Sequence, residues 1–127
     1  MVIKISNIKK FPKKNSVNKV FFVDDNYKIS GLKRYLSIKE FSCIKDLIKT
    51  KDIKKKILSF DISSKLKIIL VSLKANIASS DIENLGAEFY DIFKKSKIKD
   101  FYINSDTEPK NKNNITSYFL HGLKLKS

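Results

Sequence analysis

The sequence is poor in the residue types on which most small catalytic and metal-binding sites depend. Among its 127 residues it has one cysteine, Cys43, and one histidine, His121. Neither an intramolecular disulfide nor a two-histidine metal site can therefore form. The three glycines are too few for a phosphate-binding loop. These shortages exclude several common enzyme classes, and the single cysteine fits a reducing cytoplasm, where we expect the protein to reside.

Arginine and long apolar runs are also scarce. Arg34 is the only arginine, so 26 of the 27 basic residues are lysines. Base-reading proteins depend on the bidentate contacts of arginine, which lysine does not make. Because the lysines are spread from Lys4 to Lys126, we interpret the net charge of +14 first as solvated surface. A free-standing basic α/β module that binds nucleic acid is the alternative. No apolar run approaches the roughly 18 residues of a membrane span, so we expect no membrane partner.

What the chain does contain is typical of one folded domain over residues 1–127. Hydrophobic residues make up 42% and charged residues 31% of the sequence. Alternating or continuous apolar residues predict five strands, at residues 2–8, 20–23, 58–62, 68–71 and 98–103. The run at 68–71 is apolar at every position, which is typical of a strand covered on both faces.

Three segments have helical spacing. Ser37 and Glu40 predict a capping box at the start of a helix over residues 37–48, and Ser80 and Glu83 predict another at the start of a helix over residues 80–97. A third helix over residues 115–127 carries the apolar stripe of Ile115, Phe119 and Leu123. Strands that alternate with helices predict an α/β fold in which helices flank a layered, mixed β-sheet.

The residues that invite a functional reading have simpler structural explanations. We expect Cys43 to be a buried structural thiol, Gly86 to allow close packing within its helix, and His121 to be exposed or between domains. No catalytic, cofactor-binding or metal-binding residue is predicted. A second alternative is a small enzyme or ligand-binding domain, because this fold class binds ligands at the carboxyl ends of its strands. Those ends fall near Asp24, Ser72 and Asn104.

Three motifs give the chain a family resemblance. Residues 119–127 read F-L-H-G-L-K-L-K-S and run on without a stop signal for the helix. Residues 68–74 read I-I-L-V-S-L-K, and the next helix carries Leu85-Gly86-Ala87. In this order and spacing the motifs resemble the N-terminal domain of the leucyl (cytosol) aminopeptidases, over residues 55–127. The first half of the chain resembles that domain only in arrangement.

The resemblance implies a non-catalytic role for this chain. The family releases N-terminal amino acids from peptides, using two divalent metals, such as zinc or manganese, held in a C-terminal catalytic domain. None of its catalytic or metal-binding residues corresponds to a position here, so the chain alone should be inactive and bind no cofactor. The implied partners are that catalytic domain and, in the full-length protein, the other subunits of a hexamer. We expect Ile115, Phe119 and Leu123 to form the interdomain packing face, exposed in the isolated chain.

Overall fold

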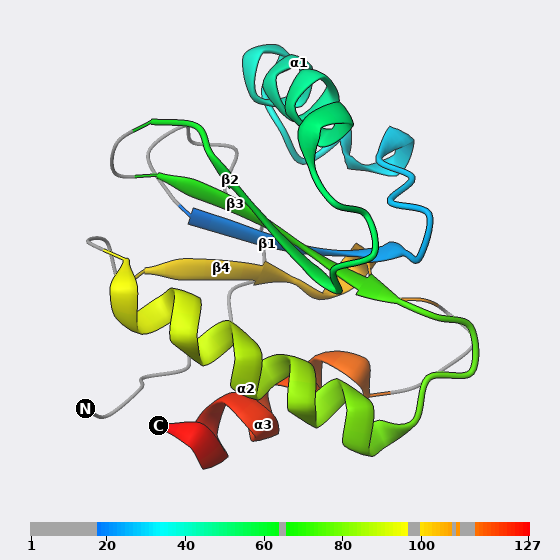
Figure 1. Ribbon diagram of the computed structural model, residues 1–127, viewed down its shortest axis with the longest axis vertical. Helices are drawn as coiled ribbons and strands as arrows, with labels where there is room; N and C mark the ends of the chain where they lie inside the picture. The colour runs from blue at the N-terminus through cyan, green and yellow to red at the C-terminus, as the bar shows by residue number, and fades with distance from the viewer. Residues whose placement is uncertain (1–17, 64–65, 97–99, 108, 110–113) are drawn as a thin grey trace.

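A four-stranded mixed sheet with helices on both faces forms the centre of the computed structural model, which describes residues 18–63, 66–96, 100–107, 109 and 114–127 (Figure 1). The predicted α/β fold is confirmed. The strands lie in the order β2-β3-β1-β4. Their bounds are β1 Asn18–Asp24, β2 Ile57–Asp61, β3 Lys67–Leu73 and β4 Phe101–Asn104. The strand predicted at residues 2–8 falls outside the described residues.

Strand β1 lies in the middle of the sheet and pairs in parallel with both β3 and β4. Val20 faces Ile69 on one side and Ile103 on the other, while β2 runs antiparallel to β3 at the edge. Because both faces of β1 and β3 are covered, these strands are buried at almost every position. The continuous run at residues 68–71 correctly predicted this central position.

The chain crosses the sheet in opposite directions on its two passages. The first runs from β1 through α1 (Ile38–Leu47) to β2 at one edge, from which the chain turns back into the antiparallel neighbour β3. The second runs from β3 through α2 (Ser79–Lys95) across β1 to β4 at the other edge. The helices of the two passages pack on opposite faces of the sheet, because α1 belongs to one core cluster and α2 to the other. Figure 1 accordingly shows α1 on one side of the sheet, and α2 with α3 (Ile115–Lys126) on the other.

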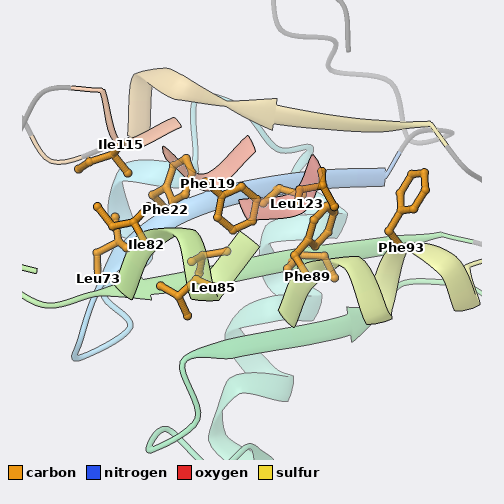
Figure 2. Close-up of a cluster of buried hydrophobic side chains, with 12 residues drawn as sticks. Phe22, Leu73, Ile82, Leu85, Phe89, Phe93, Ile115, Phe119 and Leu123 are labelled. Carbon is orange, nitrogen blue, oxygen red and sulfur yellow. The ribbon is translucent and has the colours of Figure 1, made fainter. Parts of the chain in front are cut away.

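Each face of the sheet has its own core. Alternation along β1 sends Phe21 and Val23 toward α1, and Val20 and Phe22 toward α2 and α3. On the α1 side, Ile44 is the buried anchor of the helix. The larger cluster, drawn in Figure 2, joins the sheet to α2 and α3 through Phe22, Leu73, Ile82, Leu85, Phe89, Phe93, Ile115, Phe119 and Leu123.

The two predicted capping boxes have different outcomes. Helix α1 has the predicted one, because Glu40 N–H donates to the Ser37 hydroxyl and Ser37 N–H donates to the Glu40 carboxylate. The box at Ser80 and Glu83 is wrong. Helix α2 begins one residue earlier with Ala78 as its N-cap, and the Glu83 carboxylate pairs with His121 on α3.

Helices α2 and α3 approach so closely that each places a glycine against the backbone of the other. A Cβ atom added to Gly86 would lie 1.9 Å from the carbonyl oxygen of Phe119, and one added to Gly122 would lie 1.8 Å from that of Glu83. Since neither glycine has a positive φ, the requirement is for space and not for an unusual backbone. The prediction that Gly86 allows close packing is confirmed.

We predict that Gly86→Ala and Gly122→Ala each destabilise the fold by about 1–3 kcal/mol or more, because the helices must separate to admit a methyl group. Urea unfolding followed by circular dichroism measures the loss. Gly31→Ala is the matched control, since nothing lies within 4 Å of a Cβ at that position. It should change stability by less than about 1 kcal/mol. Equal effects of all three substitutions would contradict the close helix crossing.

Candidate functional site

The stripe predicted to pack against another domain lies inside the chain's own core. Ile115 and Phe119 are fully buried, Leu123 is 3% exposed, and all three contact the sheet and α2 (Figure 2). The expectation of an exposed docking face at these residues is therefore wrong. The physical reason is that α3 needs its apolar stripe to cover the sheet beside α2, which leaves the opposite side of α3 outward.

The outward side of the helix pair carries a shallow groove instead. It has a volume of about 320 Å³ and is lined by Ser80, Glu83, Asn84, Ala87, Gly122, Leu125 and Lys126. Leu125 is 70% exposed, so it lies outside the buried apolar stripe of α3. Gly122 contributes no side chain, so the crossing itself helps to leave this space open. The groove offers an apolar floor with a carboxylate and an ammonium group at its rim.

His121 lies beside this groove and contacts Glu83 across the helix crossing. Its Nδ1 atom forms a hydrogen-bonded ion pair with the Glu83 carboxylate when the imidazole is protonated. The His121 side chain is 59% exposed, in agreement with the predicted exposed position. An exposed pair of this kind contributes little to stability, about 0–1 kcal/mol.

The polar residues at the carboxyl ends of the parallel strands lie along one edge of the sheet, as the ligand-binding alternative requires. Asp24, however, accepts hydrogen bonds from the backbone N–H groups of Asn26 and Lys28. Ser72 donates its hydroxyl to the Asp24 carbonyl at 3.4 Å. These side chains close the turn after β1, so their described contacts are structural.

Tyr27 also stabilises the turn after β1. It is buried, has a left-handed backbone (φ 55°), and donates its hydroxyl to the carbonyl of Lys55. Burial raises the pKa of Tyr27 to about 12, and a hydrogen bond with Ser72 lowers it in part. The strained backbone is thus held by the packing and the hydrogen bond of its side chain.

Asn104 and Thr107 close the neighbouring strand end. The Thr107 hydroxyl donates to the Asn104 carbonyl at 2.8 Å and accepts from Phe22 N–H at 3.0 Å. The Asn104 Oδ1 atom accepts from Thr107 N–H. Its Nδ2 atom is buried and has no hydrogen-bond partner among the described residues. A buried amide nitrogen without a partner carries an energetic cost.

Sequence reasoning missed the most strongly buried charges of the described chain. Lys19 on β1 is fully buried, and its Nζ atom lies 3.0 and 3.3 Å from the two carboxylate oxygens of Glu40. Glu40 also completes the capping box of α1, so one carboxylate joins the helix start to the sheet. The available signal was the alternation that places Lys19 on the same face as Phe21 and Val23.

The described residues do not assemble a metal or thiol site. No group of three or more His, Cys, Asp or Glu side chains lies close enough to hold a metal ion in the described part of the chain. Cys43 is half-buried in α1, which is less than the full burial we expected. Within those same residues, no helix has the length and apolar character needed to cross a membrane.

Comparison with known proteins identifies no relative, because no family model, curated protein or solved structure matches the chain.

We predict that the buried ion pair is strongly coupled. Glu40→Gln keeps the size and capping geometry of the side chain but leaves Lys19 charged without its carboxylate, and Lys19→Met leaves Glu40 charged. Each single substitution should cost about 3–5 kcal/mol, and the double variant much less than the sum. Urea unfolding of the four proteins gives the coupling energy. Additive losses would show that the two charges act independently.

We predict that Tyr27 makes the stability of the fold depend on pH in the alkaline range. Because its pKa is raised in the folded chain, the neutral phenol stabilises the fold below pH 10, and this contribution is lost as the pH rises from about 10 to 12. Tyr27→Phe should cost about 1 kcal/mol at neutral pH through the lost hydrogen bond. The stability advantage of the wild type over the variant should then shrink above pH 10. A pH-independent difference in urea unfolding would contradict the raised pKa.

Proposed function

We propose that this chain is the non-catalytic N-terminal domain of a leucyl aminopeptidase-like protein. In this role it packs on a metal-dependent catalytic domain and contributes to the assembly of an oligomer, a hexamer in the family it resembles. The catalytic domain releases N-terminal amino acids from peptides and holds the two divalent metals, zinc or manganese. This chain contributes none of those ligands.

The observation that carries the proposal is the contact between two of the motifs on which the resemblance depends. Leu85-Gly86-Ala87 lies in α2, and the F-L-H-G-L segment that begins at Phe119 lies in α3. Each motif provides a glycine against the backbone of the other helix, at Gly86 and Gly122. Two separate sequence motifs thus have one joint physical role, which is to allow this close crossing.

The order of the elements supports the same proposal. The apolar motif at residues 68–74 includes most of β3, a strand in the interior of the sheet, and α2, β4 and α3 follow it in the order that the resemblance implies. Helices α2 and α3 together cover one face of the sheet. The half of the chain with the resemblance therefore builds one complete layer of the fold.

The interdomain contact that we propose lies on the outward side of α2 and α3, in place of the buried stripe at Ile115, Phe119 and Leu123. Leu125 is exposed there beside the groove, and Lys126 and Glu83 flank it. An exposed leucine at the rim of an apolar groove is suited to burial against a second domain. We also propose a cytoplasmic location, which the single cysteine supports.

The sharpest test is the nucleotide sequence that follows the Ser127 codon in the source genome or transcript. We expect an open reading frame that continues into a catalytic domain with a carboxylate-and-lysine metal motif. A stop codon directly after Ser127 would overturn the proposal.

The isolated chain provides a second, biochemical readout of the same proposal. With leucine p-nitroanilide and manganese it should release no more p-nitroaniline than a metal-only blank, because the catalytic groups belong to the other domain. The full-length protein expressed in parallel is the positive control. Turnover by the isolated chain that persists in repeated preparations would contradict the non-catalytic role.

A further inference from the structure

Among the residues that the structure describes, positive charge is concentrated on the α1 side of the sheet. Residues 28–56 include ten of the 27 basic residues but only three acidic ones, so this segment carries half of the net charge of +14. The segment contains α1 and the two short 3₁₀ turns at Ser30–Leu32 and Ile48–Thr50. We call the exposed cations of this segment the basic face: Lys28, Lys33, Arg34, Lys39, Lys45, Lys49, Lys51, Lys54, Lys55 and Lys56.

Burial of Glu40 increases the excess of positive charge at the surface of residues 28–56. All ten cations of the basic face are exposed, whereas Glu40 is withdrawn into the interior by Lys19. Asp46 and Asp52 are the exposed acids of the segment, and Asp24 and Asp25 lie before it at the end of β1. Cations therefore remain in clear excess at the surface around α1.

The two helices described on the opposite side of the sheet are balanced in charge. Helices α2 and α3 together carry four acidic residues and four lysines, besides His121. Lysines spread evenly over all solvated surfaces would raise the positive charge of both sides alike. The contrast between the two sides therefore revises the interpretation of the charge as evenly solvated surface, and it indicates a surface for an anionic partner.

Two features distinguish a nucleic acid from an anionic membrane as that partner. A helix that binds membranes turns its apolar face outward, but Phe41, Ile44 and Leu47 of α1 face the sheet. The exposed large apolar side chains on the α1 side are the isoleucines Ile38 and Ile53, which lie beyond opposite ends of the segment from Lys39 to Thr50. A surface of exposed lysines without an apolar insertion face matches the phosphodiester backbone better than a lipid surface.

The aromatic residues favour a duplex over a single strand as the partner. Single strands are held by exposed rings on which bases stack, yet none of the exposed large apolar side chains among the described residues is aromatic. On the basic face, Lys33 lies over the Phe41 ring at 5.4 Å and Arg34 over the Tyr35 ring at 5.4 Å. Both rings are half-buried and have cations over them, which makes them poor platforms for base stacking.

We propose that the basic face binds the phosphate backbone of a nucleic-acid duplex without reading its sequence. The duplex has the higher charge density, which the spread of lysines over α1 and its flanking turns can neutralise. This site lies on the opposite side of the sheet from the α2–α3 groove. The inference is therefore independent of the proposed aminopeptidase relationship, and the two can fail separately.

The test compares two variants with the same net charge. The basic-face variant is Lys39→Gln, Lys45→Gln and Lys49→Gln, and the control variant is Lys95→Gln, Lys124→Gln and Lys126→Gln on α2 and α3. All six lysines are exposed. Binding to a short fluorescent DNA duplex is measured by anisotropy between about 50 and 200 mM salt. Urea unfolding of both variants checks that the fold is intact.

We expect the wild type to bind two duplexes of unrelated sequence equally, and the single strand more weakly. The basic-face variant should lose about tenfold or more in affinity, and its salt dependence should be shallower by about one unit per phosphate contact removed. The control variant should lose less than about threefold. Equal losses in both variants, no duplex binding by the wild type, or tighter binding to phosphatidylserine vesicles than to the duplex would each overturn the proposal.

Discussion

The buried pair of Lys19 and Glu40 is the interaction on which the α1 side of the molecule depends. A lysine in the middle of an apolar sheet face is tolerated only with a carboxylate at its ammonium group, because an unpaired buried charge costs several kcal/mol. Glu40 can fill that position only while Ser37 begins the helix, since the same carboxylate accepts the Ser37 N–H. One carboxylate therefore determines where α1 starts, which face it turns to the sheet, and how much positive charge remains uncompensated outside.

The other face of the sheet is organised by space and not by charge. Gly86 and Gly122 let two helix backbones approach to a distance that any side chain would prevent. Phe89 and Phe119 can then share one layer above the sheet, with ring centroids 5.5 Å apart. The motifs that suggest an aminopeptidase N-terminal domain belong to this face, whereas the basic residues that suggest a nucleic-acid partner belong to the other. A single small domain thus presents two surfaces of different chemistry.

Local signals predicted the fold well, and they failed where a distant residue competed. The capping box at Ser37 and Glu40 and the buried strand at residues 68–71 depend on neighbours in sequence, and both are present. Ser80 and Glu83 have an equally good spacing, but His121, 38 positions away, takes the Glu83 carboxylate. The stripe of Ile115, Phe119 and Leu123 showed which side of α3 is apolar but not what covers it. Burial of Lys19 was hidden for the same reason, because its partner lies on another element.

The central position of β1 has a consequence for how the chain folds. Val20 pairs with Ile69 and with Ile103, so the first described strand is completed only by segments far along the sequence. Pairings at such separation raise the contact order, which slows folding relative to helical bundles of similar size. During synthesis, the apolar residues of β1 leave the ribosome well before β4 and α3 exist to cover them. A chaperone that binds extended apolar segments would therefore find its best substrate in this protein at residues 20–23, before the second half of the chain has been made.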